Sequence, residues 1–386
     1  MKTFDVAVLG LGAIGSATVY QLAKRQTRVL GIDRYSPPHQ LGSTHGASRI
    51  TREAIGEGEH LTPLARRSHQ IWREIELETG RSLLSTSGLL IISSSAKTSS
   101  THVERFLANT IAAARRYGIV HELLGADAIR ARYPQFRVHD DELGYFEPGG
   151  GFVRPEACVA AQLDLARRHG ADIRVNEPVT TIVPAAGEVS IKTNVDDYRA
   201  KTVILAAGAW LPQFLDIGVA RAFRVSRQVM FWFAPGDDSF RLDRFPVFIW
   251  ELSGRPQAIY GFPDIDGAGV KVATEQYDLT TPADSIARDV SSKEIAIMHH
   301  NLIAPFLPQL PANCVRASAC LYTVTADFGF VIDRHPQSER VVIASCCSGH
   351  GFKHSAALGE VLAELALTGR SRIDLVPFTL GRLLPA

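Results

Sequence analysis

Residues 10–15, with the sequence GLGAIG, constrain the fold of this 386-residue chain more than any other stretch. A continuous apolar run at residues 6–9 precedes them, as is typical of a parallel strand buried on both faces. A helical pattern through Val19 and Leu22 follows, and a second apolar run at residues 29–32 ends at Asp33. The order of strand, glycine turn, helix, strand and acid predicts a Rossmann-like unit that binds a dinucleotide.

Each glycine of this turn has its own expected task. Gly10 permits the tight turn, Gly12 lets the backbone approach a pyrophosphate, and Gly15 lets the helix sit close to the strand. The N-terminus of the helix offers amide groups and the positive end of its dipole to the phosphates. Asp33 can accept a hydrogen bond from a ribose hydroxyl. The expected nucleotide contacts are Gly10, Gly12, Ala13, Ile14, Gly15, Asp33 and Arg34.

Two later segments return to the same kind of structure. Residues 201–210 (KTVILAAGAW) form a buried strand that ends in small residues, including Ala207 and Gly208, against which a cofactor can lie. Residues 340–369 predict another strand, a turn rich in glycine, and a helix. The motif alone does not separate NAD from FAD, but an N-terminal motif with late returns to the sheet is typical of flavoproteins. An ordinary tight turn with a solvated lysine is the alternative for the last segment.

The middle of the chain has a different pattern. Thr62 as a cap and Pro63 at the first position predict a helix whose buried stripe is formed by Leu64, Ser68, Ile71, Trp72 and Ile75. Residues 223–271 alternate between apolar and polar without regular helices, which predicts a second, largely antiparallel layer. The expected fold class is α/β with an α+β second layer. The expected division is an FAD-binding domain at 1–80, 150–216 and 327–386, and a substrate domain at 81–149 and 217–326.

Composition narrows the function classes. The chain is 46% hydrophobic and 21% charged, as soluble enzymes are, and its 41 basic and 40 acidic residues give a charge of +1. No basic run stands out, so we expect neither nucleic acid nor a membrane surface as a partner. The five cysteines are sparse and unevenly spaced, which argues against a disulfide framework or a zinc site, and for a reducing cytoplasm. No apolar segment is long enough to span a bilayer.

Several residues could take part in chemistry. The loop at residues 42–58 contains His45, Arg49 and Arg52. Two arginines three apart can lie on one side of a helical turn, and a guanidinium fits a carboxylate; a solvated basic loop is the alternative. Lys271 lies in a strand, and alternation alone leaves open whether it points inward or outward. Cys320 lies in the strand ACLYTVTAD, whose pattern favours a small core hydrophobe rather than a reactive thiol.

Taken together, the motifs resemble the monomeric sarcosine oxidase and N-methyltryptophan oxidase family of FAD-dependent amine oxidases. The resemblance runs over nearly the whole chain, through FDVAVLGLGAIG, PPHQLGSTHGASRITREAIGEGE, YGFPDIDGAGVK, CLYTVTADFGFVID and SGHGFKHSAALGEVLAELALTG. It implies FAD held by a thioether to Cys320, and a lysine near the flavin, Lys271, that promotes reaction with oxygen. Cys346 and Cys347 lie in the turn at the same expected site, so either thiol is an alternative attachment point.

The resemblance also implies roles for other residues. The expected catalytic residues are Lys271, Arg49, His45 and Tyr260, and the expected substrate-binding residues are Arg52 and Lys353, which hold a carboxylate, with Glu275 and Ile55. The further expected cofactor contacts are Ser43, His45, Ser48, Arg49, Ala207, Gly208, Trp210, Cys320, Gly349, His350, Gly351 and Lys353. Glu275 stands where the family has a pocket histidine, and Ile55 where it has a tyrosine. Glu275 could hold a cationic amine or point away.

The expected reaction oxidises the C–N bond of a secondary-amine amino acid, with an N-methyl, N-alkyl or cyclic amine, to an imine that hydrolyses. Oxygen is reduced to hydrogen peroxide, and we expect a monomer in the cytoplasm. The resemblance predicts FAD as the cofactor. Because the pocket departs from the family at Glu275, it does not predict sarcosine itself as the substrate. Three alternatives stay open: a flavin dehydrogenase that uses a carrier protein or quinone, a non-catalytic flavin-binding protein, and an NAD-dependent dehydrogenase.

Overall fold

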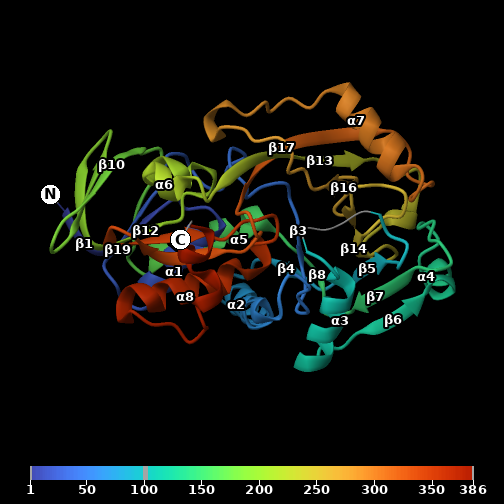
Figure 1. The fold of residues 1–386 in the computed structure, drawn as a ribbon, viewed down its shortest axis with the longest axis horizontal. Coiled ribbons are helices and arrows are strands. Elements are labelled where there is room, and N and C mark those ends of the chain that lie inside the picture. Colours follow the sequence, from blue (N-terminus) through green and yellow to red (C-terminus); the bar gives the residue numbers. More distant parts are fainter. Residues whose placement is uncertain (1, 99–102, 385–386) are drawn as a thin grey trace.

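The computed structural model describes residues 2–98 and 103–384 and contains two large sheets. Figure 1 shows the first sheet, with β1, β12 and β19, toward one end of the long axis, and the second, with β5, β7 and β14, toward the other. Helices cover the first sheet, as expected for strands buried on both faces. The α/β fold class with a second, mainly antiparallel layer is confirmed.

The first sheet has a parallel centre. β1 (Lys2–Leu9) pairs in parallel with β2 (Val29–Ile32) and β12 (Asp197–Leu205), β2 with β9 (Asp172–Arg174), and β12 with β19 (Ser338–Ser345). β10 (Val179–Pro184), β11 (Val189–Thr193) and β18 (Val331–His335) add antiparallel strands. Three helices, α1 (Ala13–Lys24), α5 (Pro155–Arg168) and α8 (Ser355–Thr368), pack together beside it. Strands from the start, middle and end of the chain therefore share one sheet.

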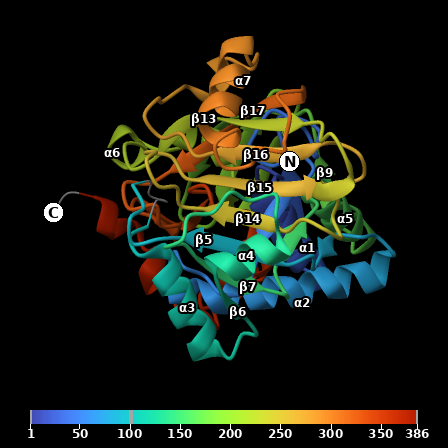
Figure 2. The ribbon, with the colours of Figure 1, turned by 90° about the vertical axis from the view of Figure 1, so that its right-hand side faces the viewer.

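The second sheet has the order β17-β13-β16-β15-β14-β5-β7-β6, and Figure 2 shows its strands nearly face-on. Only the pair β14–β5 is parallel. Its strands are β5 (Leu89–Ser93), β6 (Glu122–Gly125), β7 (Leu143–Glu147), β13 (Arg224–Phe233), β14 (Val247–Trp250), β15 (Ile259–Asp264), β16 (Val270–Thr274) and β17 (Cys314–Val324). Four further helices are α3 (Phe106–Tyr117), α4 (Ala126–Arg132), α6 (Ile217–Ala220) and α7 (Ser292–Met298). A third sheet joins β3 (Arg49–Thr51), β8 (Gly151–Val153) and β4 (Leu84–Ser85).

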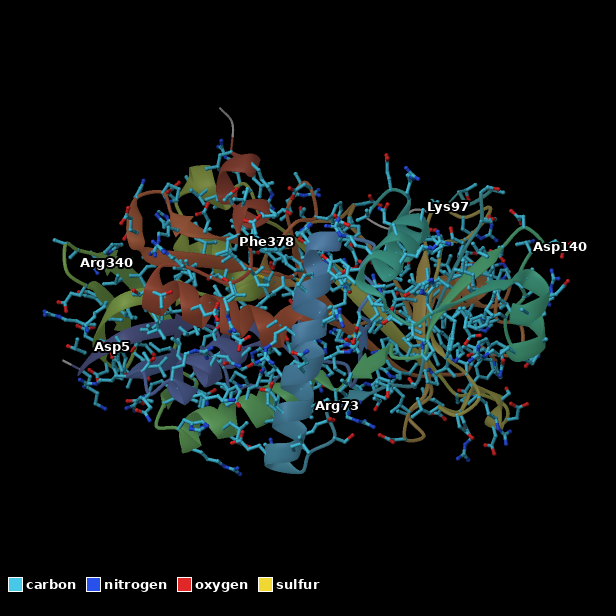
Figure 3. The ribbon with its side chains drawn as sticks, turned by 90° about the horizontal axis from the view of Figure 1, so that it is seen from below. Asp5, Arg73, Lys97, Asp140, Arg340 and Phe378 are labelled. Atoms are coloured by element: carbon cyan, nitrogen blue, oxygen red, sulfur yellow. The ribbon has the colours of Figure 1, made fainter. Side chains whose placement is uncertain are left out.

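Helix α2 (Thr62–Thr79) lies between the two ends of the molecule in Figure 3 and packs against α8. Its predicted stripe is buried at all five positions, which confirms the helical spacing. The predicted cap is wrong: Thr62 is the first helical residue, and Leu61 occupies the cap position with no side-chain hydrogen bond. The preceding 3-10 turn, Glu59–Leu61, runs directly into the helix, so no side-chain cap forms. None of the helices in the described segments has both the length and the apolarity to cross a membrane.

Candidate active site

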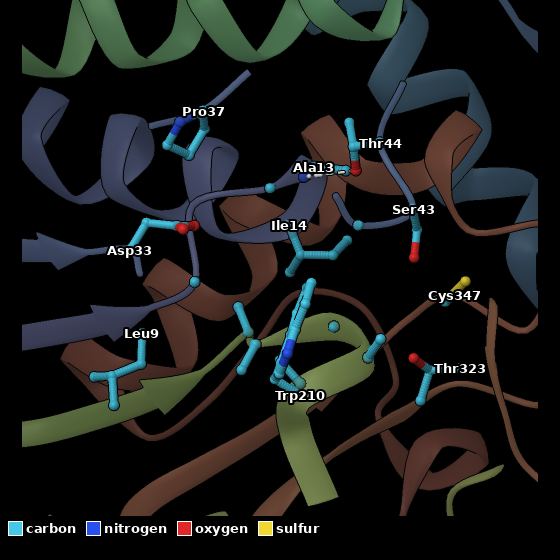
Figure 4. A pocket seen from close by; sticks show the side chains of 18 of the residues that line it. Leu9, Ala13, Ile14, Asp33, Pro37, Ser43, Thr44, Trp210, Thr323 and Cys347 are labelled. Carbon is cyan, nitrogen blue, oxygen red and sulfur yellow. Dashed lines mark hydrogen bonds between the residues drawn. The ribbon is translucent and has the colours of Figure 1, made fainter. Parts of the chain in front are cut away.

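A cavity of about 280 Å³ runs along the carboxyl ends of β1, β2 and β12, where open α/β sheets bind their ligands. Figure 4 shows Ala13, Asp33, Ser43 and Trp210 around it. Most of the predicted nucleotide contacts line this cavity: Gly10, Gly12, Ala13, Ile14, Asp33, Arg34, Ser43, Ala207, Gly208, Trp210, Gly349 and Gly351. Residues from four distant parts of the sequence therefore meet in one place.

Gly10 has the conformation that its turn demands. Its φ is +90°, and a Cβ at this position would lie 2.5 Å from the carbonyl oxygen of Ala206. The turn therefore requires glycine both for its backbone angle and for the close approach of β12. Gly15 does not line the cavity; a Cβ there would lie 1.7 Å from the Gly10 oxygen, so this glycine serves the packing of α1 on the turn.

The substitution Gly10→Ala is expected to lower the free energy of unfolding by about 2–4 kcal/mol, from left-handed backbone strain plus the clash with Ala206. Gly118→Ala is the matched control, because Gly118 also has a positive φ, +63°, but nothing lies within 4 Å of its missing Cβ. Its expected cost is about 1 kcal/mol, from strain alone. Denaturant unfolding of both variants measures the difference, and equal losses would contradict the close approach.

Asp33 ends β2 and faces the same cavity. Its Oδ2 accepts from the N–H of Leu11 at 2.7 Å and its Oδ1 from the N–H of Tyr35 at 2.8 Å. Burial raises the pKa of this carboxyl group, and the two backbone donors oppose that rise. Arg34 instead lies over the rings of Tyr35 and Trp210, at 5.1 and 5.3 Å. The carboxylate is thus held at the wall by the turn itself.

A second cavity of about 90 Å³ joins the first. Arg49, Tyr322, Gly349 and Phe352 line both cavities, so these four residues mark where the two meet. Ser48, His350 and Lys353, predicted as cofactor contacts, line the second cavity rather than the first. Aromatic and aliphatic side chains make up much of its remaining wall: Ile50, Phe106, Met230, Ile249, Ala258, Ile259, Tyr260 and Phe262.

One face of the second sheet builds a wall of this cavity. The register pairs Cys320 with Gln228 on β13, and Trp232 of β13 with Lys271 on β16. Because side chains alternate between faces along a strand, one face carries the following residues: Cys320, Tyr322, Met230, Lys271, Tyr260 and, just beyond β16, Glu275. The other face carries Val229, Phe231, Val270 and Val272 in a hydrophobic core. Pairing register thus gathers residues as far apart in the sequence as Met230 and Tyr322.

Lys271 points inward and is 2% exposed. Its Nζ donates to the carbonyl oxygens of Gly46 at 3.0 Å and Ser48 at 2.7 Å, and lies 3.9 Å from the ring centroid of Phe262. Burial, followed by the charge of Arg49, lowers its pKa well below the ordinary value for lysine. Three backbone and ring contacts therefore hold the amine in place at the cavity wall.

Arg49 lies on the short strand β3, which pairs with β8, so Arg49 and Arg52 do not share the helical turn that their spacing allows. Both arginines nevertheless line the second cavity. Arg49 Nη2 donates to the Ser43 oxygen at 2.7 Å. His45 is fully buried but lines neither cavity, and within the described residues its two ring nitrogens have no hydrogen-bond partner. Burial, followed by the charge of Arg49, lowers the pKa of His45 to about 3.

Arg52 and Lys353, predicted to act together, meet at one end of the second cavity. Glu57 lies between them: its Oε2 is 2.5 Å from Arg52 Nη2, and its Oε1 is 3.0 Å from Lys353 Nζ. Burial lowers the pKa of Lys353 to about 8, although Glu57 acts in the opposite direction. Sequence reasoning missed Glu57; the available signal was that two buried cations require a buried anion.

Two predicted residues are placed differently from the rest. Ile55 is fully buried in a hydrophobic core with Leu61 and Leu64, and lines neither cavity. Cys320 is 1% exposed and is also absent from both linings. It packs with Met230 and Tyr322, close to the junction of the cavities. Burial raises the pKa of its thiol to about 11, and Arg49 is the largest influence in the opposite direction.

The other thiols near the site are Cys346 and Cys347 on the turn after β19, and both line the first cavity. All five cysteines of the chain fall within the described residues and are free. Across residues 2–98 and 103–384, no group of histidine, cysteine and acidic side chains has the arrangement of a metal site.

Comparison with known proteins shows the family of the chain. The sequence profile of the FAD dependent oxidoreductase family matches residues 5–365. The chain belongs to this family. It is 39% identical to the monomeric sarcosine oxidase of Streptomyces avermitilis, over 100% of this chain and 99% of that protein. It is 33% identical to the N-methyl-L-tryptophan oxidase of Yersinia pestis, over 98% and 99% of the two chains. The resemblance found in the motifs is confirmed.

Solved structures of other proteins share the fold. NikD, an amino acid oxidase essential for nikkomycin biosynthesis, superimposes with a TM-score of 0.84 at 25% identity, covering 98% of both chains. L-proline dehydrogenase from P. horikoshii superimposes with a TM-score of 0.82 at 20% identity, covering 99% and 98%, which supports the fold alone. The protein is accordingly an FAD-dependent amine oxidase by family.

The residues of the first cavity fit FAD. No acidic residue occupies the first turn of α1, and Ala13 and Ile14 of that turn line the cavity, so a phosphate can bind at this helix N-terminus. Asp33 stands at the end of β2 for a ribose hydroxyl. Near the junction with the second cavity, the buried Thr323 hydroxyl has no partner in the described part of the chain, although it lines the cavity (Figure 4). A hydrogen-bonding ligand would satisfy it.

Proposed function

We propose that this protein oxidises the C–N bond of a secondary-amine amino acid, with an N-methyl, N-alkyl or cyclic amine, to an imine that hydrolyses, while O2 becomes H2O2. The observation that carries the proposal is the pair of buried cations, Arg52 and Lys353, at the end of a small cavity that opens onto the nucleotide cavity. The names of the relatives, sarcosine oxidase and N-methyl-L-tryptophan oxidase, support the same substrate class.

FAD, when bound, would supply the two-electron redox chemistry that protein side chains lack. The side chains of this protein bind and orient the substrate. Arg52 offers a guanidinium fork and Lys353 an ammonium to a carboxylate. Since Glu57 neutralises only one of these two positive charges, a substrate carboxylate completes the charge balance of the cluster.

The other residues of the cavity wall orient the substrate and exclude water. Phe106, Ile249 and Phe262 present apolar surface to the substrate and exclude water, which strengthens the electrostatic interactions inside. Arg49 and Lys271 place positive charge near the junction of the cavities, where negative charge develops as oxygen is reduced. On this ground, we propose that Lys271 promotes the reaction with oxygen.

We further propose that the flavin is attached by a thioether to Cys320. Its position on the cavity-facing side of β17, beside Arg49, supports this assignment. Cys347, which lines the first cavity, is the alternative thiol.

The free cysteines support a reducing cytoplasm, and the name of the Streptomyces relative supports a monomer. The division into an FAD-binding domain (1–80, 150–216, 327–386) and a substrate domain (81–149, 217–326) also stays a proposal.

A substrate panel tests this function by peroxide release. N-methyl, N-alkyl and cyclic amino acids are compared with primary amino acids and with secondary amines that lack a carboxylate. We expect a carboxylate-bearing secondary amine to exceed its carboxylate-free counterpart by roughly 100-fold in kcat/KM, as expected for contact with a buried cation pair. The same assay under nitrogen with an artificial acceptor distinguishes an oxidase from a dehydrogenase. If only primary amines or amines without a carboxylate reacted, the proposal would be contradicted.

A further inference from the structure

Arg52 and Glu57, which form an ion pair at the wall of the second cavity, belong to one short stretch of chain, the 52–57 segment. This segment follows directly after β3, whose pairing with β8 ends where Thr51 lies opposite Gly151. Beyond that pair, the buried backbone N–H groups of the segment need acceptors outside the ladder. The groups that hold this backbone therefore decide where the Arg52 side chain begins.

A buried carboxyl group from the second sheet supplies those acceptors. Glu147 is the last residue of β7 and is 1% exposed. Its Oε1 accepts from the N–H of Glu53 at 2.7 Å, and its Oε2 accepts from the N–H of Ala54 at 3.3 Å. The hydroxyl of Tyr145 also donates to Oε2, at 2.8 Å, so a third donor holds the carboxyl group itself in place. Glu147 thus continues the hydrogen bonding of the segment where the pairing of β3 stops.

The backbone that Glu147 holds also holds the guanidinium group of Arg52. Arg52 Nε donates to the carbonyl oxygen of Ala54 at 3.0 Å, while the N–H of Ala54 donates to Glu147. The Cζ atom of Arg52 lies 5.1 Å from the ring centroid of Phe106 on α3. Because a guanidinium binds a carboxylate through a planar fork, its orientation matters for binding. A chain of hydrogen bonds from Glu147 through Ala54 therefore sets the orientation of Arg52.

Helix α3 holds the other end of the 52–57 segment. Asn109 Nδ2 donates to the carbonyl oxygen of Gly56 at 3.3 Å. A Cβ on Gly56 would lie 2.4 Å from the hydroxyl oxygen of Thr110, so the backbone at this end packs directly on the helix. Glu147 and α3 thus fix the segment on both sides of Glu57 and its partner Arg52, whereas Lys353 reaches the cluster from the turn before α8.

We propose that Glu147 is a positioning residue for the binding of the substrate carboxylate, although it lines neither cavity. It acts through the backbone of Glu53 and Ala54, which sets how Arg52 meets Glu57 and faces the second cavity. This inference rests on the proposed function and adds a residue that controls affinity for a carboxylate from outside the cavity.

The substitution Glu147→Gln separates this role from the size of the side chain. Glutamine fills the same space and keeps one acceptor oxygen, but its amide NH2 group does not accept a hydrogen bond. The N–H of Glu53 or that of Ala54 therefore loses its acceptor, because each donates to a different oxygen of Glu147. The 52–57 segment is then held less firmly, while every side chain that lines the second cavity stays the same.

Binding of a matched ligand pair to the oxidised holoenzyme tests the proposal. Cyclopentanecarboxylate and cyclopentanecarboxamide have nearly the same shape and carry no amine that could be oxidised, but only the first is charged. Titration followed by the flavin absorbance is expected to give wild type about tenfold tighter binding of the carboxylate. In Glu147→Gln the carboxylate should bind about tenfold more weakly than in wild type, and the carboxamide should bind within about twofold of wild type.

Glu142→Gln is the matched control, because Glu142 is a second buried carboxyl group, 2% exposed, immediately before β7. It accepts from the N–H of His139 and from Nε1 of Trp250, both at 2.7 Å, and lines neither cavity. Denaturant unfolding should show that both variants are destabilised, yet Glu142→Gln should bind both ligands as wild type does. If it lost carboxylate affinity as Glu147→Gln does, general loss of stability would explain the effect, and the role of Glu147 would be overturned.

Stopped-flow reduction under nitrogen, with the best substrate of the panel, provides the second measurement. In Glu147→Gln the apparent Kd of the substrate is expected to rise about tenfold, while the limiting rate of reduction changes less than about threefold. If this variant does not fold, Tyr145→Phe replaces it, because it removes one donor to Glu147 and keeps the buried ring. Its expected rise in apparent Kd is about threefold.

The two measurements distinguish failure of this role from failure of the proposed function. If secondary-amine amino acids reduce the flavin but the variant keeps the wild-type preference for the carboxylate, or the wild-type apparent Kd, the role of Glu147 is overturned and the proposed function stands. If no such amino acid reduces the flavin of the wild-type protein, the proposed function itself fails.

Discussion

Replacing Lys271 with methionine is expected to slow reoxidation of the reduced holoenzyme by oxygen about 100-fold or more, while the rate of reduction by substrate changes less than about tenfold. Methionine keeps the length of the side chain but removes the amine that donates to Gly46 and Ser48. The positive charge that would stabilise developing negative charge on oxygen is then lost from the junction of the cavities. Stopped-flow measurement of the two half-reactions separates the effects.

The control for this experiment lies on the same sheet face, on β17, two strands away from Lys271. Arg316 stacks on Trp232 at 4.4 Å, contributes to the lowered pKa of Lys271, and lines neither cavity. Arg316→Met removes one positive charge from the same region but leaves the lysine amine, so reoxidation should slow less than about tenfold. Equal slowing of both half-reactions in Lys271→Met would contradict the role assigned to the lysine.

Replacing Cys320 with serine is expected to abolish covalent attachment of the flavin completely. Serine preserves the size of the buried side chain, but its oxygen does not form the thioether. Acid precipitation is the measurement: the wild-type pellet should stay yellow, whereas the pellet of Cys320→Ser should be colourless and its supernatant yellow. Mass spectrometry of the intact chain gives the same answer independently.

Cys347→Ser is the matched control, because Cys347 lines the nucleotide cavity and packs against the cluster that contains Cys320. This variant should keep its covalent flavin. If Cys320→Ser retained the flavin and Cys347→Ser lost it, the attachment point would be Cys347. Retention in both variants would direct attention to Cys346, the remaining thiol of that turn.

Local patterns predicted many of the residues that line the first cavity. Gly10, Asp33 and the small residues after β12 all line one cavity, because a strand, a tight turn and a helix are adjacent in sequence as well as in space. The helical stripe of α2 was predictable for the same reason. The cap at Thr62 was not, because the 3-10 turn Glu59–Leu61 runs directly into the helix, and a helical turn at Arg49 was excluded by the extended pairing of β3 with β8.

The arrangement of the residues around the second cavity depended on contacts between residues that are distant in the sequence. Alternation along β16 left the direction of Lys271 open, and the pairing of β16 with β13 decided that it faces the cavity. Glu57 gained its importance only when folding placed Lys353 beside it, 296 residues away. Ile55 was expected in the pocket from its neighbours in sequence, but it packs in the core beside Leu61.

By itself the sequence determined the fold class, the glycine turn and the family, because each depends on short-range order along the chain. The tertiary structure decided which charges meet: Glu57 lies between two cations, Arg52 and Lys353, at the wall of the second cavity. Electrostatic interaction depends on distance in space and on burial rather than on separation in sequence. For that reason, the cluster of Arg52, Glu57 and Lys353 became visible only in the folded chain.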